Sequence, residues 1–177
     1  ALILPPSEVV PTAYMMEVAA SIHMLPLVWR SIDWKILRWL VLGAVMGTPF
    51  GIIFLEEVPQ EMMRVAISVI VLTASLLLWK NIRIKSSERW YTILGVGFCS
   101  GVINGAAGVG GLPVVLLFLS ISTGSSLTRA SMVAYLFIID LFALLLPGSQ
   151  QLISTELLGR TAIFLIPLMV GIYIGHR

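Results

Sequence analysis

The 177-residue chain has few charged residues and almost no cysteine. Asp, Glu, Lys and Arg make up 11% of it, whereas a soluble domain has about 25%. So few charges cannot cover a soluble surface, which excludes a soluble enzyme. The formal net charge is only +2, which gives no electrostatic basis for binding nucleic acid. Cys99 is the single cysteine, so an internal disulfide is excluded.

Long apolar stretches take the place of the missing charges. Hydrophobic residues make up 58% of the chain, and the mean hydropathy is +1.00. A helix that crosses a membrane needs about 20 mostly apolar residues. The stretches are apolar all round rather than on one face, which indicates lipid rather than a soluble core. Five qualify or come close: Val9–Val28, Ile36–Leu55, Met62–Trp79, Leu127–Leu146 and Leu157–Ile174. We therefore expect an all-α, polytopic membrane helical bundle.

The charges between these stretches predict their direction. The loop after the first stretch is basic, the next loop is acidic, and the loop after the third stretch is basic again. Basic loops stay on the cytoplasmic side. The first span should therefore run from outside to inside, the second back out, and the third in again. Tryptophans gather near the expected span ends, as in an aromatic belt; they are Trp29, Trp34, Trp39, Trp79 and Trp90.

The stretch from Trp90 to Ile121 is apolar but crowded with glycine. Glycine and proline at this density break helices. We expect a helix up to Ala107, then irregular backbone, then a short helix over Val114–Ile121. Irregular backbone at membrane depth survives only where protein buries it or where it lines a cavity. The segment either enters and leaves the membrane on the cytoplasmic side or crosses the membrane. Re-entry puts one more basic residue on the cytoplasmic side, so the loop charges favour it by a single residue.

A weak internal repeat divides the chain. Ala13–Met16 matches Ala130–Val133 at an offset of 117 residues. Glycines spaced by four occur in the second span, and a similar ladder occurs in the last one. Chance among glycines in apolar helices is the alternative. We expect 1–85 to be the remainder of a first repeat with three transmembrane helices. Residues 86–177 would be a second repeat, with a broken helix and two transmembrane helices, in one membrane domain.

The glycine-rich segment Gly101–Pro113 resembles the signature of the TauE/SafE sulfite-exporter family of membrane transporters. The family pattern is a break of the form G-x-x-G-x-x-G-x-G-G, followed shortly by a proline and later by a span that opens near an Arg-Ala pair. This chain matches it with the run Gly105–Gly111, with Pro113 and with Arg129-Ala130. The resemblance implies two homologous halves, so this chain would be a fragment that lacks the first glycine-rich segment and the last span. It also implies a bacterial inner-membrane protein that exports or imports sulfite, a sulfonate or a related organosulfur anion, with a proton gradient as the assumed driving force.

The break itself predicts an anion site. A new helix N-terminus exposes backbone N–H groups at the positive end of the helix dipole. Proline suits the first turn of such a helix, because it has no N–H to leave unpaired. Asn104 either donates a hydrogen bond to the anion or caps the broken backbone, and both interpretations stay open. The expected substrate-binding residues are Asn104, Gly105, Gly108, Gly110, Gly111, Pro113 and, at the mouth of a span, Arg129.

Ionisable residues inside membrane spans are functional hypotheses. The offset of 117 residues pairs Asp140 with His23, so both are candidates for proton coupling. Structural pairing of Asp140 with a hydroxyl group or with His23 is the alternative. Glu17 is expected near the outer interface, in contact with solvent. Arg129 either draws anions toward the site or reaches the interface as a topology-setting residue.

The sequence thus predicts a secondary transporter of a small anion, without catalytic residues, cofactor or metal. Its partners would be the anion, the lipid bilayer and protons, with self-association into a homo-oligomer as a further hypothesis. Two alternatives remain from other classes. One is a membrane subunit that does not transport, and the other is an intramembrane enzyme that uses His23 and Asp140.

Overall fold

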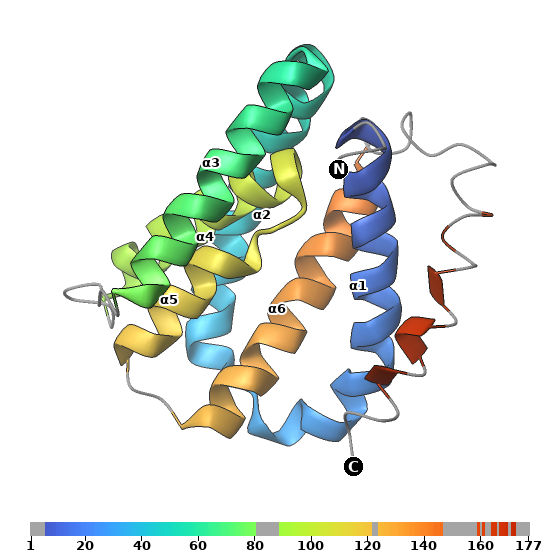
Figure 1. The fold of residues 1–177 in the computed structure, drawn as a ribbon. Helices are drawn as coiled ribbons and strands as arrows, with labels where there is room; N and C mark the ends of the chain where they lie inside the picture. The colour runs from blue at the N-terminus through green and yellow to red at the C-terminus, as the bar shows by residue number, and fades with distance from the viewer. Residues whose placement is uncertain are drawn as a thin grey trace.

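The computed structural model describes residues 6–80, 89–121 and 124–146, together with 159, 161, 164–165, 167–169 and 171–172. The regular elements in the continuous ranges are all helices (Figure 1). They are α1 (Pro6–Val28), η1 (Trp29–Ser31), α2 (Trp34–Glu57), α3 (Gln60–Trp79), α4 (Trp90–Ala107), α5 (Gly111–Ile121) and α6 (Ser125–Leu145). The expected all-α class is confirmed for these ranges.

The helices follow the expected spans closely. Three of them are long and apolar enough to cross a membrane: Trp34–Glu57, Glu61–Trp79 and Ser125–Leu145. Helix α1 covers the first expected span with 23 residues. Half of the fifth expected span, 157–174, lies outside the described residues. The chain therefore has the elements of an integral membrane bundle.

The broken helix returns to the end of the bundle from which it started. In Figure 1, α4 rises beside α2, α5 runs back, and α6 starts at the same end as α4. With 11 residues, α5 is about 16 Å long, which is too short for a hydrocarbon core of about 30 Å. This path is the one expected of a re-entrant segment, and α6 runs antiparallel to α1 (Figure 1). This is the direction that an inverted repeat requires, although the repeat itself stays a prediction.

All five tryptophans lie toward one end of the bundle, where α1 and α3 finish and α2 and α4 begin. Four of them form ring contacts there: Trp29 with Trp34, and Trp39 with Trp90. Arg30, Lys35 and Arg38 are at the same end, whereas Glu56 and Glu57 close α2 at the other. The aromatic and basic residues therefore gather at one end of the bundle, as expected for a membrane interface, and the direction of the spans stays a prediction.

Helices α2 and α4 pack backbone against backbone. Gly43, Gly47 and Gly51 of α2 face Gly97, Gly101 and Gly105 of α4. A Cβ atom added at Gly47 would lie 2.2 Å from the Phe98 carbonyl oxygen. A Cβ atom at Gly101 would lie 2.3 Å from the Ala44 carbonyl oxygen. Each of these two rows of glycines, spaced by four residues, is therefore the packing partner of the other.

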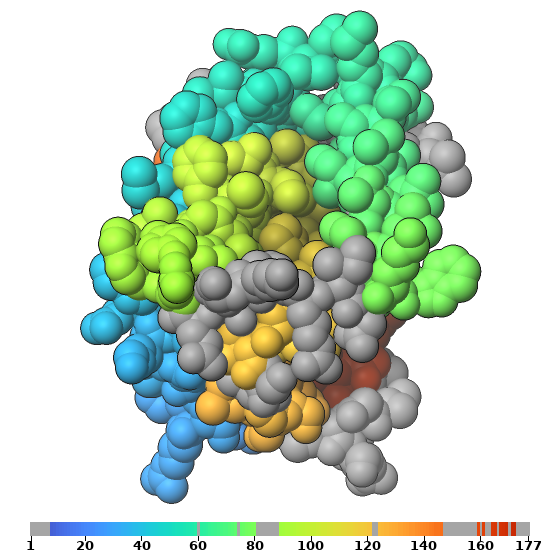
Figure 2. Space-filling view, turned by 90° about the vertical axis from the view of Figure 1, so that its left-hand side faces the viewer, coloured from blue at the N-terminus to red at the C-terminus, as the bar shows by residue number. Residues whose placement is uncertain are grey.

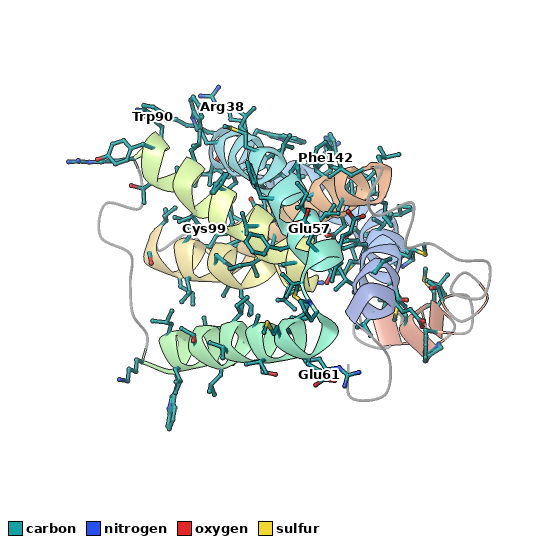
Figure 3. The ribbon with its side chains drawn as sticks, turned by 90° about the horizontal axis from the view of Figure 1, so that it is seen from above. Arg38, Glu57, Glu61, Trp90, Cys99 and Phe142 are labelled. Carbon is teal, nitrogen blue, oxygen red and sulfur yellow. The ribbon has the colours of Figure 1, made fainter. Side chains whose placement is uncertain are left out.

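Side-chain packing joins α5 and α6 to this pair. The main core contains Leu37 and Leu40 of α2, Leu117 and Phe118 of α5, and Tyr135 of α6. Helix α3 stands apart, because only 6% of its apolar window is buried in the chain, against 44% for α2. Figure 3 shows α3 separated from the other helices, and Figure 2 shows a hollow between α3 and α4 with α5 deep inside it. The apolar surface of α3 therefore suits contact with lipid.

The glycine contact predicts a sharp difference between two alanine substitutions in α4. Gly101→Ala forces a Cβ atom onto the α2 backbone, and overpacking of this kind costs about 1–3 kcal/mol. Gly95→Ala is the matched control, because nothing lies within 4 Å of its added Cβ atom. In thermal unfolding in detergent, the melting temperature should fall clearly for Gly101→Ala and stay unchanged for Gly95→Ala. Equal melting temperatures for the two variants would contradict the backbone contact.

Candidate functional site

The break between α4 and α5 is built on a left-handed glycine. Helix α4 ends at Ala107, and Gly108 follows with φ +67°. Its N–H donates to the Asn104 carbonyl oxygen at 2.8 Å, which closes the last turn. A glycine in the left-handed conformation is the common end of a helix. Helix α5 begins at Gly111 with Pro113 in its first turn, so the expected broken helix is confirmed.

Asn104 bridges the break. Its side-chain Oδ1 accepts a hydrogen bond from the Gly110 N–H at 3.0 Å. Its Nδ2 donates to Oδ1 of Asp140 on α6 at 2.7 Å. The side chain is fully buried, and Gly110 leaves space for it, because a Cβ atom there would lie 2.6 Å from the Asn104 Cβ. Of the two interpretations of Asn104, capping of the broken backbone is the one present in this structure.

Two further polar residues, Ser100 of α4 and Tyr135 of α6, support the same turn. The Ser100 hydroxyl donates to the Gly110 carbonyl oxygen. It also shares a hydrogen bond of 2.7 Å with the Tyr135 hydroxyl. Both residues are fully buried. The Gly110 peptide group is therefore bonded at its N–H by Asn104 and at its carbonyl by Ser100.

Helix α1 covers the break. The Tyr14 hydroxyl donates to the Asn104 carbonyl oxygen, the same atom that accepts from the Gly108 N–H. Gly108 lies under α1, since an added Cβ atom would be 3.6 Å from side-chain carbons of Val10 and Ala13. The irregular backbone is thus enclosed by α1, α4 and α6. This meets the requirement that non-helical backbone in a membrane be buried in protein.

Comparison with known proteins agrees with this architecture. The family model described as Sulfite exporter TauE/SafE matches residues 1–177. The chain belongs to the TauE/SafE family. No curated protein and no solved structure matches it. Because TauE/SafE proteins are membrane transporters, the enclosed break lies in a protein of a transport family.

Five of the expected TauE/SafE site residues meet at or beside the break. Asn104, Gly108 and Gly110 form it, and Gly111 and Pro113 open α5. A Cβ atom at Gly111 would lie 3.7 Å from a methyl group of Leu136 on α6. Gly105 points the other way, into the α2 backbone at Thr48 and Gly51, so its contacts are with the scaffold.

Arg129 and His23 do not join the break. Arg129 is exposed and lines a pocket of about 590 Å³ with Met24 and Ser125, where α1 ends and α6 begins. It lies 11 residues before Asp140, which is about 16 Å along the axis of α6. His23 is exposed, so the structural pairing of His23 with Asp140 that the sequence left open is not found.

Glu17 is placed differently from the sequence expectation. The residue is half-buried, its Oε2 atom is buried without a hydrogen-bond partner among the described residues, and its carboxyl group interacts with Asp140. The expectation of a solvated Glu17 was therefore wrong. The sequence gives the depth of Glu17 along α1, but its surroundings depend on α6, which packs on that face of α1.

Sequence reasoning also missed Tyr14, Ser100 and Tyr135. Each carries a single hydroxyl in an apolar span, and each is buried. Buried hydroxyl groups need hydrogen-bond partners. The sequence could therefore have indicated these three residues as candidates, but it could not have indicated which groups they bond. Among the described residues, no group of three or more His, Cys, Asp or Glu side chains is arranged to hold a metal ion.

The bridge predicts a large stability loss on replacing Asn104. Asn104→Leu keeps the volume but leaves the Gly110 N–H and the Asp140 carboxyl without their bonds. Each buried group left without a partner costs about 1–3 kcal/mol. The neighbouring variant Ile103→Leu is the control. Detergent unfolding should separate the two variants clearly, and an Asn104→Leu protein as stable as the control would contradict the bridging role.

Proposed function

We propose that this protein is a secondary transporter that moves a small oxyanion, such as sulfite, a sulfonate or a related organosulfur anion, across a bacterial inner membrane. The enclosed helix break is the observation that supports this proposal most strongly. Membership of a transport family gives the class, and the break gives a place where backbone N–H groups and a helix dipole are available to an anion.

In this proposal the anion binds beside the first turn of α5. Gly111 and Pro113 are partly exposed there, and Gly111 has no side chain to block approach to its N–H. Asn104 and Gly110 have a different task, because their polar groups are already bonded to each other and to α6. They fix the direction in which α5 begins. Gly105 keeps α4 in place against α2.

Arg129 would act at the entrance rather than at the binding site. It is exposed in the pocket between α1 and α6, about 16 Å from the depth of Asp140. A fixed positive charge at a pocket raises the local concentration of anions. We therefore assign Arg129 to attraction of the substrate.

The structure gives less support to an intramembrane enzyme. That alternative needs His23 and Asp140 to converge on one cavity, but His23 is exposed and Asp140 is fully buried. A membrane subunit without transport activity would share the same fold. Flux through the purified protein separates this last alternative from a transporter.

Radiolabelled sulfite flux into proteoliposomes tests the function, with Pro113→Leu as the variant. Proline fixes the backbone of the first turn, and loss of this restriction is worth on the order of 1 kcal/mol, a severalfold fall in flux. Pro26→Leu is the control, because Pro26 is an exposed proline near the end of α1. Absence of flux with sulfite and with sulfonates would contradict the proposal. Equal flux in both variants would remove Pro113 from the site.

Ionic strength tests the entrance role of Arg129. Arg129→Gln should slow uptake at low salt, and the deficit should shrink at high salt because exposed charges are screened. Arg38→Gln is the control, since Arg38 is exposed at the same end of the bundle. If the two variants respond alike, the effect is one of overall charge and the assignment fails.

A further inference from the structure

Two carboxyl groups meet inside the bundle, where α1 packs against α6. Asp140 is fully buried, and its Oδ1 accepts from Asn104 while its Oδ2 has no partner. Glu17 Oε2 is likewise buried and without a partner. Helices α1 and α6 pack along each other, and the two side chains interact across this contact. Two adjacent carboxyl groups, each with one buried and unpaired oxygen, require an explanation.

A single proton satisfies both oxygens. Two carboxylates side by side in apolar surroundings cannot both be ionised, because like charges repel and both lose their hydration. A protonated carboxyl is a donor as well as an acceptor. One O–H···O bond between the two groups therefore removes one charge and gives each unpaired oxygen a partner. The proton then belongs to the pair rather than to one residue.

Among the described residues, no cationic side chain acts on either carboxyl group. The groups that face the pair are Tyr14 from α1, Tyr135 from α6 and Asn104 from α4, all of them neutral side chains. The remaining charged side chains on the described parts of the helices do not act on either carboxyl. They are Glu8 and His23 on α1, Arg30 on η1, Lys35, Arg38, Glu56 and Glu57 on α2, Glu61 and Arg64 on α3, and Arg129 on α6.

We propose that Glu17 and Asp140 form a proton-binding site that holds one proton between them and communicates with the helix break through Asn104. The connection is short and direct: Asp140 accepts from Asn104, and Asn104 accepts from the Gly110 N–H. Release of the proton to water takes the pair from one negative charge to two. The proton site stands on its own observations, and its effect on an anion rests on the proposed function.

The position of the pair fixes the sign of that effect. A second negative charge beside the start of α5 opposes an anion there, so loss of the proton should weaken anion binding. By linkage, a bound anion should favour the proton to the same extent. Repulsion within the doubly charged pair would also push α1 from α6, and α1 carries the Tyr14 and Val10 contacts over the break.

Infrared spectroscopy of the purified full-length protein tests the proton site without any transport measurement. The protein at neutral pH should show the C=O stretch of a protonated carboxylic acid that survives exchange into buffer. Glu17→Gln and Asp140→Asn, both close in shape to the native residues, should each shift or remove this band, and the double variant should remove it. Glu57→Gln and His23→Gln are controls that should leave it unchanged.

Two results would overturn the proton site: no such band in the unmodified protein, or a band that either single variant leaves unchanged.

Coupling between the proton and the anion is measured separately, by calorimetric binding of methanesulfonate, which stays ionised over the pH range used. Affinity should fall severalfold as pH rises, and the double variant should lose this dependence. A normal band without methanesulfonate or sulfite binding would refute the proposed function while leaving the proton site in place.

Discussion

The two hydrogen bonds of the Asn104 side chain are the constraint on which the rest of this structure depends. A helix that breaks inside a membrane leaves peptide groups without partners, and lipid supplies none. Asn104 bonds the first peptide beyond the break and, with its other end, Asp140 on α6. The irregular backbone thereby becomes an ordered part of the protein interior. Without this bridge, the start of α5 would have no fixed direction.

The other helices support this bridge through two different sets of contacts. The paired glycine ladders join α2 and α4 into a rigid unit that carries the break at one end. Helices α1 and α6 pack on each other. Helix α1 supplies Tyr14 and one carboxyl group, and α6 supplies the other carboxyl group and Tyr135, which bonds Ser100. Because the carboxyl pair and the break share Asn104, a change of charge at one reaches the other through a single side chain.

Much of this architecture follows from the sequence, and the limits have physical reasons. Apolar length and glycine density predicted the spans, the end of α4 at Ala107 and the short α5, because these are local properties. The partner of each glycine ladder and the contact of Glu17 with Asp140 depend on how distant helices pack. The repeat offset pointed to His23 instead, but equivalence in a repeat does not make two residues neighbours. In the antiparallel pair α1 and α6, Glu17 is the residue that meets Asp140.

The central claim is that an anion binds at a break held by Asn104 and enclosed by α1. Hydrogen–deuterium exchange of the full-length protein, with and without saturating methanesulfonate, tests it most directly. The account predicts slower exchange at the amides of residues 108–113, with α2 and the first turns of α4 unchanged. Exchange at 108–113 that is indifferent to the anion, or protection that appears only elsewhere, would contradict it.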